Sequence, residues 1–212
     1  MRGKFITVEG IEGAGKTTAI KYLAKLLEKA GIDFILTREP GGTAIAEAIR
    51  KILLIPTSEK ICVDTEVLLM FAARAQHIYH VIEPALSAGK WVVSDRFTDA
   101  TYAYQGGGRR SSKERIAEIE KWVQGKLQPD WVIILDVSAK LGMQRVAKRG
   151  GSKDRIEQEK IDFFEQVRQT YLERAKQNPK RYCVIDANQD LNHVQVDLYR
   201  EIDIKIRDWE KQ

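Results

Sequence analysis

The residues best suited to chemistry lie near the start of the chain, in the stretch GIEGAGKTT at residues 10–18. This stretch satisfies the pattern GxxxxGK[ST] and follows the apolar run FITVE. Its glycines let backbone N–H groups face phosphate oxygens, and a helix that begins near Lys16 directs its positive end at them. We expect Lys16 to reach the outer phosphates of a nucleoside triphosphate and the Thr17 hydroxyl to bind Mg²⁺. The residues predicted to surround these phosphates are Gly10, Glu12, Gly13, Ala14, Gly15, Lys16, Thr17 and Thr18.

A second candidate pair, Asp95 and Arg96, bears on what receives the phosphate. A GTPase would carry NKxD and DxxG motifs, which are absent, and a motor ATPase would carry Asp-Glu at the end of a strand-like run, where this chain has Asp95-Arg96 and Asp136-Val137. A kinase needs cations for an anionic acceptor and a lid that excludes water. Asp95 can hold the water shell of the metal, and Arg96 can bind an acceptor phosphate through its planar guanidinium. We favour a kinase over an NTP-hydrolysing regulatory protein.

Two glycine-containing basic segments match neither the helical nor the strand period. One is QGGGRR at residues 105–110, which predicts a flexible turn, and the other is KRGGSKDR at residues 148–155. The second segment places a glycine pair among four cations. It predicts a mobile lid over residues 148–158 that brings positive charge to the transferred phosphate and expels water.

The rest of the chain alternates between short apolar segments and amphipathic ones. Such alternation predicts right-handed βαβ units and a parallel sheet covered by helices on both faces, within one domain spanning residues 1–212. The predicted strands are 5–9, 33–37, 91–95, 131–137 and 182–187, and the predicted helices are 16–29, 44–54, 64–88 with a possible interruption near Pro84, 112–126, 138–149, 157–177 and 190–209.

Composition excludes several classes of protein. No apolar run approaches the ~18 residues of a membrane span and no signal peptide opens the chain, so we expect a cytoplasmic protein without membrane contact. The net charge of +5 is spread along the whole length, which does not favour nucleic-acid binding. Cys62 and Cys183 have no paired spacing and are expected to be buried, reduced thiols. His77 and His80 are expected to be surface or core histidines rather than metal ligands.

Several motifs together resemble the bacterial thymidylate kinase family, in matching order from residue 3 to about residue 190. They are GIEGAGKTT (10–18), TREPGGT (37–43), FAAR (71–74), DRF (95–97), TYAYQGGG (101–108) and DRIE (154–157). The resemblance implies a five-stranded parallel sheet of the P-loop kinase type, a homodimer packed through helices, and transfer of the γ-phosphate of ATP to dTMP. The nearest alternative with the same fold is a deoxynucleoside kinase, which would have less need of two arginines for an acceptor phosphate.

The same resemblance assigns roles within the acceptor site. Glu12 would accept a hydrogen bond from the 3′-hydroxyl of the deoxyribose, and Arg50 and Arg96 would bind the acceptor phosphate. Arg74 would donate to a thymine carbonyl, and Tyr104 would fill the space that a ribose 2′-hydroxyl needs. The remaining residues that the resemblance places at dTMP are Glu39 and Pro40, in a bend with a cis proline, together with Thr101 and Gln105.

The sequence departs from many relatives at the thymine face. Where these relatives place a stacking Phe, four residues before the base-reading arginine, this chain has Met70, followed by Phe71. Either side chain could cover the base, and the other would fill the core.

A second departure concerns the source of catalytic charge. Gly13 stands where some relatives carry an arginine in the phosphate loop, so the cations should come from the lid: Arg149 and Arg155, with Lys153 third. The residues that the resemblance places near adenine are Arg145, Ala187, Asn188 and Gln189.

Overall fold

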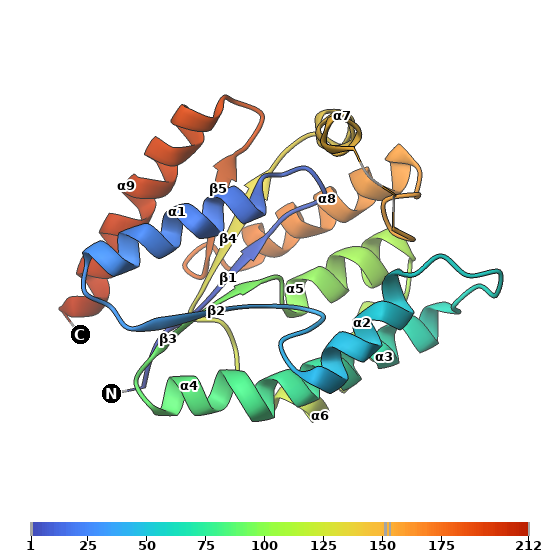
Figure 1. The fold of residues 1–212 in the computed structure, drawn as a ribbon, viewed down its shortest axis with the longest axis horizontal. Helices are drawn as coiled ribbons and strands as arrows, with labels where there is room; N and C mark the ends of the chain where they lie inside the picture. Colours follow the sequence, from blue (N-terminus) through green and yellow to red (C-terminus); the bar gives the residue numbers. More distant parts are fainter. Residues whose placement is uncertain (1, 151, 153, 212) are drawn as a thin grey trace.

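The computed structural model describes residues 2–150, 152 and 154–211. At its centre is a five-stranded parallel sheet in the order β2-β3-β1-β4-β5 (Figure 1). The strands are β1 (Phe5–Glu9), β2 (Phe34–Arg38), β3 (Trp91–Asp95), β4 (Trp131–Asp136) and β5 (Tyr182–Asp186). All five predicted strands are therefore confirmed, and the predicted ends differ from these by no more than a residue.

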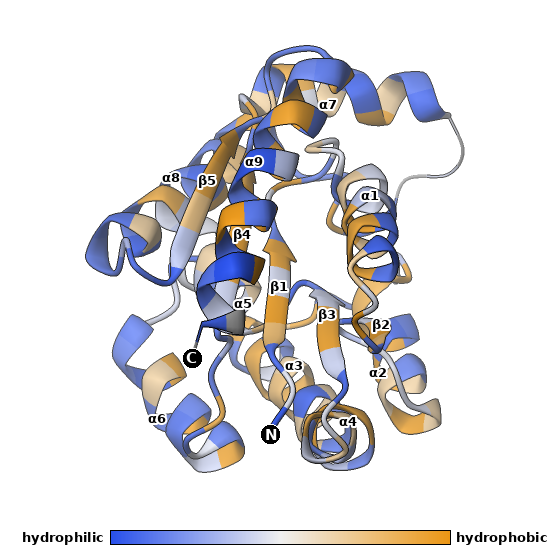
Figure 2. Cartoon of the chain, turned by 90° about the vertical axis from the view of Figure 1, so that its left-hand side faces the viewer, coloured by the Kyte–Doolittle hydropathy of each residue, from blue (hydrophilic) through white to orange (hydrophobic). Residues whose placement is uncertain are grey.

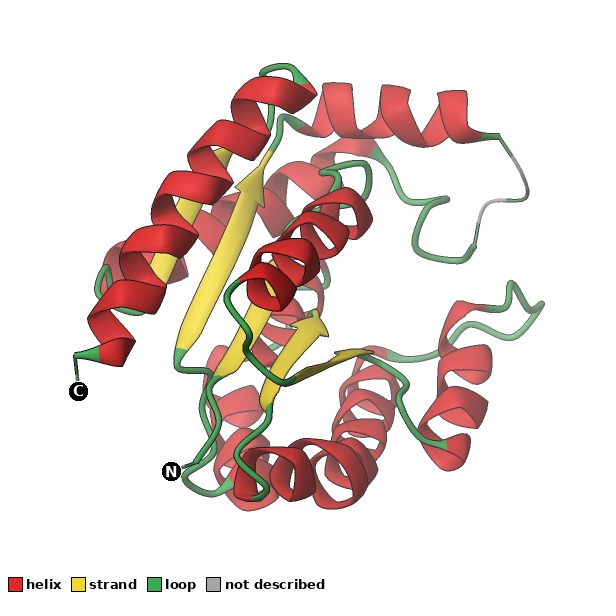
Figure 3. Cartoon of the chain, turned by 60° about the vertical axis from the view of Figure 1, so that its left-hand side comes forward, coloured by secondary structure: helices red, strands yellow, loops and turns green. Residues whose placement is uncertain are grey.

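Helices cover both faces of the sheet, and α1 and α9 pack against each other on one of them (Figure 3). The helices are α1 (Lys16–Lys29), α2 (Ala44–Leu54), α3 (Val63–His77), α4 (Glu83–Ser87), α5 (Thr98–Thr101), α6 (Lys113–Gln124), α7 (Ala139–Arg149), α8 (Ile161–Gln177) and α9 (Leu191–Glu210), with π-helical turns η1 (Ile78–Ile82) and η2 (Tyr102–Gly108). The layered α/β fold class is confirmed.

Two predicted helices differ in detail from the structure. The helix predicted over residues 64–88 is interrupted at η1, one turn before Pro84, which lies in the first turn of α4. A proline lacks an N–H and crowds the preceding turn, so a π-helical turn there accommodates it. The helix predicted from residue 157 begins instead at Ile161, because Asp154 caps a turn by accepting from the N–H groups of Ile156 and Glu157.

Burial explains why the sequences of the three inner strands, β3, β1 and β4, are almost continuously apolar. Every residue of β1 is buried, as are all residues of β4 except its last, and Figure 2 shows the hydrophobic colouring on these strands. The outer strands β2 and β5 are only partly covered. Strands with helices on both faces have no polar face to present, so they lack the alternation of a half-exposed sheet.

Strand order brings the candidate residues to one edge of the sheet. β1 lies between β3 and β4, and Val8 of β1 is in register with Asp95 at the end of β3. The phosphate loop follows β1 directly and Arg96 follows β3. Both therefore meet at the carboxyl ends of adjacent strands, where parallel α/β sheets bind their ligands.

The glycine run at residues 105–110 is not the flexible turn that the sequence predicts. Residues up to Gly108 belong to η2, which packs along α8. A side chain at Gly107 would overlap Thr170, and one at Gly108 would overlap the ring of Phe163. The glycines therefore permit close approach between two helical segments.

The expectation for the cysteines is also wrong in part. Cys62 is exposed at the N-cap of α3, in the surface turn that precedes the helix, and Cys183 is half-buried. The histidines lie in the core and at the surface, as expected: His77 is buried beside Thr37 and Glu39, and His80 is exposed. Among the described residues, no helix is both long and apolar enough to cross a membrane.

Candidate active site

The phosphate loop joins β1 to α1 through three glycines with left-handed or extended positive φ: Gly10 at 138°, Gly13 at 75° and Gly15 at 93°. These angles favour glycine and turn the loop around a central space. The Lys16 amine lies in that space, where it donates to the carbonyl oxygens of Gly10 at 3.1 Å and Ile11 at 3.2 Å. Burial, with the nearby Arg96 guanidinium, lowers the pKa of Lys16 to about 8, although Asp95 and Glu12 oppose the shift.

The loop is in backbone contact with α7 on its other side. A Cβ atom at Gly13 would overlap the carbonyl oxygen of Gly142, and one at Gly142 would lie 2.6 Å from the carbonyl oxygen of Glu12. The positions of the loop and of α7 are thus fixed by two glycines facing each other.

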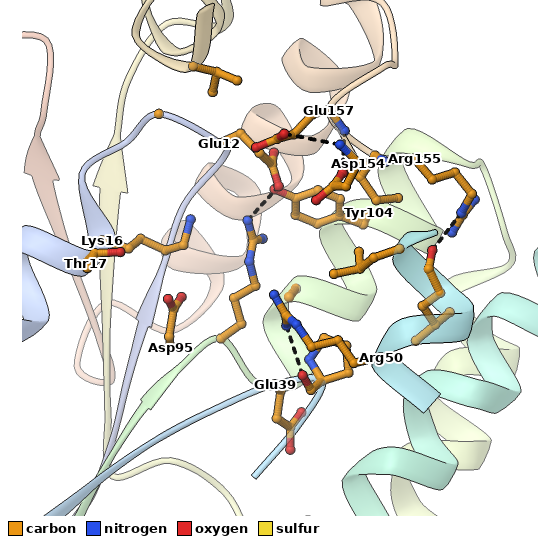
Figure 4. Close-up of a pocket in the computed structure, with 18 of the residues that line it drawn as sticks. Glu12, Lys16, Thr17, Glu39, Arg50, Asp95, Tyr104, Asp154, Arg155 and Glu157 are labelled. Atoms are coloured by element: carbon orange, nitrogen blue, oxygen red, sulfur yellow. Dashed lines mark hydrogen bonds and ion pairs between the residues drawn. The ribbon is translucent and has the colours of Figure 1, made fainter. Parts of the chain in front are cut away.

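Glu12, which sequence reasoning placed at the acceptor sugar, is held by two side chains. Arg96 Nη2 donates to Glu12 Oε1 at 2.8 Å, and the Tyr104 hydroxyl donates to Oε2 at 2.7 Å. The Arg96 guanidinium also lies over the Tyr104 ring, 4.5 Å from its centroid. Three predicted site residues from distant parts of the chain therefore form one contact group, of which Figure 4 labels Glu12 and Tyr104.

Arg96 itself has a strained backbone, with φ at 71°. Its N–H donates to Val8 of β1, and its carbonyl accepts from the Ser94 hydroxyl at 2.7 Å. Left-handed conformations of residues other than glycine are costly and persist where the surroundings fix them. The left-handed backbone of Arg96 directs its guanidinium towards Glu12 of the phosphate loop.

A further acid, Glu9, supports this arrangement and was not identified from the sequence. It is fully buried, and it accepts hydrogen bonds from the N–H of Phe97 at 2.7 Å and the Tyr171 hydroxyl at 2.8 Å. Arg96 Nη1 donates in turn to Tyr171 at 3.3 Å. Burial and the nearby Asp99 raise the pKa of Glu9 to about 8. The available signal was an acid at the end of an apolar strand, directly before the phosphate loop.

Arg74, which the resemblance places at thymine, is fully buried and is not among the residues that line a cavity. Arg74 is 0% exposed, and its Nε donates to Glu39 at 2.8 Å while Nη2 donates to Phe97 O and Thr101 Oγ1. Its remaining Nη1 is buried and donates to no described residue. A buried donor left free in this way is costly unless something binds to it. The peptide bond between Glu39 and Pro40 is cis, as expected.

One cavity of about 660 Å³ joins the phosphate loop to Glu39 and Pro40 and to Arg149, Ser152 and residues 154–157. Met70 and Gln105 line it, and Arg50 lies at its wall with Nη1 donating to Pro40 O at 2.9 Å. Phe71 is 1% exposed and packs instead in a core cluster below Arg74, whose guanidinium lies 4.7 Å from the Phe71 ring centroid.

The predicted lid cations lie in different surroundings. Arg149, whose side chain is 63% exposed, forms an ion pair with Glu157 at the cavity. Arg155 extends towards α2, away from Lys16 (Figure 4), where Nε donates to Leu53 O at 2.7 Å. Lys153 and Gly151 lie outside the described residues.

The residues predicted near adenine do gather beside the loop. Arg145 Nη1 donates to Ala187 O at 2.9 Å and to Gly13 O at 3.4 Å, and Asn188 Oδ1 accepts from Ser138 N. Gln189 lines a second cavity, of about 250 Å³, together with Arg145 and Ala187.

The same edge of the sheet offers a fit to Mg²⁺. Thr17 is exposed in the first turn of α1, and Asp95 lines the main cavity with its Oδ1 buried and without a hydrogen-bond donor among the described residues. No group of three metal-binding side chains occurs in the part of the chain that the structure describes. One carboxylate and one hydroxyl suit a Mg²⁺ ion that takes its other ligands from phosphates and water.

Comparisons with known proteins agree with this geometry. The family model described as thymidylate kinase matches residues 8–198. A protein named thymidylate kinase from Ectopseudomonas mendocina (strain ymp) is 58% identical over 198 residues, covering 93% of this chain and 94% of its own length. One of the same name from Pseudomonas entomophila (strain L48) is 58% identical over 195 residues, covering 92% of each chain. On these matches, the chain belongs to the thymidylate kinase family.

Proposed function

We propose that this protein transfers the γ-phosphate of ATP to dTMP, giving dTDP and ADP. The observation that carries the proposal is a single cavity lined at one end by the phosphate loop and at the other by Arg50, Arg96 and Met70. Two arginines at the acceptor end suit a substrate that already carries a phosphate. The free Nη1 of Arg74 suits a carbonyl oxygen such as O4 of thymine.

The chemistry requires positioning and charge stabilisation rather than a covalent intermediate. A phosphate oxygen of dTMP, held by Arg50 and Arg96, attacks the γ-phosphorus, and the bond to the bridging oxygen of ADP breaks. Lys16 offsets charge on the outer phosphates. Thr17 and Asp95, the latter partly through water, would hold Mg²⁺, which would supply positive charge that offsets the charge of the phosphates. Arg149 is the lid cation best placed to approach the transferred group.

The Glu12 contacts suggest how the sugar is selected. Both Glu12 oxygens already accept one hydrogen bond, and each retains a lone pair for the 3′-hydroxyl of a deoxyribose. The Tyr104 ring, fixed by its bond to Glu12 and by Arg96, would occupy the space of a 2′-hydroxyl. We therefore assign Tyr104 the preference for dTMP over its ribo-analogue.

We assign the thymine face to Met70. Met70→Ala is expected to raise the KM for dTMP about tenfold, because a soft side chain that covers the base is lost. Phe71→Leu should leave that KM unchanged and lower stability by about 1–2 kcal/mol, since it changes only core packing. Steady-state kinetics and thermal unfolding of both variants test the assignment. A raised KM in Phe71→Leu alongside a normal one in Met70→Ala would reverse it.

Lys16 predicts a pH dependence of ATP binding. Its pKa is about 8 in the free protein and should rise once phosphates surround the amine. An amine whose pKa rises on binding takes up a proton when the ligand binds. The affinity for ATP therefore weakens as the pH rises through the pKa that Lys16 has in the free protein. We expect ATP affinity to fall about tenfold between pH 7 and pH 9. Calorimetry at pH 8 in buffers of different ionisation enthalpy should show uptake of roughly half a proton. Lys16→Arg, which stays charged, should show no uptake, and a pH-independent affinity would contradict the prediction.

One assay tests the function itself. ATP and Mg²⁺ are mixed with dTMP, with thymidine or with no acceptor, and formation of ADP is followed. We expect rapid turnover only with dTMP. Turnover with thymidine would indicate a deoxynucleoside kinase, and turnover without acceptor would indicate an NTP-hydrolysing protein.

We also propose that the protein is a cytoplasmic homodimer. Exposed apolar side chains on α2, α3 and α6 support a helix-packed interface; they include Ile45, Ile52, Leu68 and Trp122, the last 84% exposed. Light scattering after size-exclusion chromatography tests the oligomeric state.

A further inference from the structure

The buried carboxylate of Glu66, on α3, has no part in the reaction as described above. Its side chain is 2% exposed and lies at the wall of the main cavity. Oε1 accepts a hydrogen bond from Gln105 Nε2 at 2.7 Å, and Oε2 lies 2.6 Å from Arg155 Nη2. Arg109 Nε is 3.6 Å from Oε1. One acid therefore contacts both a residue of the acceptor site and a residue of the lid.

Glu66 determines which way the Gln105 amide faces. A carboxylate only accepts hydrogen bonds, so the NH₂ group of Gln105 must turn towards Glu66. The amide oxygen is then left on the other side, where it is buried and receives no hydrogen bond from the described residues. Since Gln105 lines the cavity, this arrangement offers a fixed acceptor to a ligand.

The contact with Arg155 fixes the lid segment. Besides its ion pair with Glu66, Arg155 donates through its backbone N–H to Leu54 O at 3.0 Å and through Nε to Leu53 O at 2.7 Å. These bonds attach the chain after α7 to the end of α2 and to α3. Arg155 is thus directed towards the acceptor side rather than towards the phosphate loop (Figure 4).

We propose that Glu66 is a positioning residue that connects the two halves of the site: it presents the Gln105 oxygen to the acceptor base and, through Arg155, holds the lid in register with that base. The proposal rests on the proposed function, because it supposes a thymine in the cavity.

The base preference follows from hydrogen-bond chemistry. Thymine presents a carbonyl acceptor, O4, beside a donor, N3–H. Arg74 Nη1 supplies a buried donor and Gln105 Oε1 a buried acceptor, neither with a partner among the described residues, so together they complement these two groups of thymine. Cytosine presents the reverse order, an amino donor beside the unprotonated N3. With Glu66 in place, Gln105 cannot turn to suit cytosine.

The first experiment is Glu66→Gln, with kcat/KM measured for dTMP and for dCMP. A neutral amide accepts either orientation of Gln105, so we expect the dTMP value to fall, while the dCMP value stays low because Arg74 still presents a donor to the amino group of cytosine. Their ratio should drop about tenfold or more. A purely structural defect would lower both values together. Glu159→Gln is the matched control, because Glu159 pairs with Arg109 at 2.6 Å and does not line the cavity.

The second experiment tests the connection to the lid. Arg155→Met, Glu66→Gln and the double variant are compared by kcat for dTMP at saturating ATP. If the two residues act through one contact, each single change should lower kcat about tenfold and the double change should lower it little further. Additive losses, near a hundredfold, would overturn the connection.

A control within the same assay separates this inference from the proposed function. If the unmodified protein does not phosphorylate dTMP, the proposed function fails. If it does, and Glu66→Gln keeps the ratio of dTMP to dCMP, the inference fails. If Glu66→Gln does not fold, Gln105→Met is used to test base selectivity and Arg155→Met is used to test the connection to the lid. An unchanged preference for dTMP over dCMP in Gln105→Met, together with an unchanged kcat in Arg155→Met, would also overturn the proposal.

Discussion

Replacing Lys16 by alanine is expected to lower kcat/KM by ~10²-fold or more, which is the typical effect of removing a fixed electrostatic donor from a reacting group. The amine lies inside the phosphate loop, held by two carbonyl oxygens that would exchange it for phosphates on binding. The nearby Arg96 is engaged with Glu12 and Tyr171. The measurement is steady-state kinetics with ATP, Mg²⁺ and dTMP.

Lys21→Ala is the matched control, since this lysine is exposed on the same helix, α1. It removes an equal charge without touching the loop and should leave kcat/KM within about twofold. Near-normal turnover in Lys16→Ala would show that the loop does not bind the outer phosphates of ATP.

Arg149→Ala is expected to lower kcat by ~10²-fold while KM for ATP and binding of dTMP stay nearly unchanged. An interaction made mainly in the transition state acts on kcat alone. In the structure Arg149 is paired with Glu157, so the proposed role requires it to exchange that partner for the transferred phosphate. A cation that arrives only with both substrates also limits wasteful hydrolysis of ATP.

Two comparisons make the result specific. Lys148→Ala removes the adjacent exposed cation of α7 and should change kcat little. Equilibrium binding of dTMP to Arg149→Ala should match that of the unmodified protein. If Arg149→Ala keeps kcat within a few-fold, the charge on the transferred group comes from another residue and the lid assignment is wrong.

The parts of the molecule that could be predicted from sequence are those whose residues are contiguous. The phosphate loop is one uninterrupted stretch, and each inner strand is an unbroken apolar run. Local spacing alone specifies both. The η2 segment was mispredicted because glycines are compatible with a flexible turn and with close helix packing. Only the position of α8 distinguishes them.

The contacts that organise the site join residues far apart in sequence. Tyr171 lies 162 positions from its partner Glu9, and Arg96 lies 84 positions from Glu12. Acid and base side chains are common along this chain, so local spacing cannot identify which of them meet. Arg155 meets Glu66 because the segment after α7 lies against both α3 and the end of α2.

The contact between Gly13 and Gly142 restricts how this enzyme could change its source of charge. A side chain at position 13 would require both a backbone angle that residues other than glycine rarely adopt and a displacement of α7. Yet α7 ends at Arg149, the cation that a loop arginine would replace. Moving α7 to admit the new charge would displace the existing one. In this geometry a loop cation and the Arg149 cation therefore exclude each other, and the source of charge can change only together with a repacking of α7 against the loop.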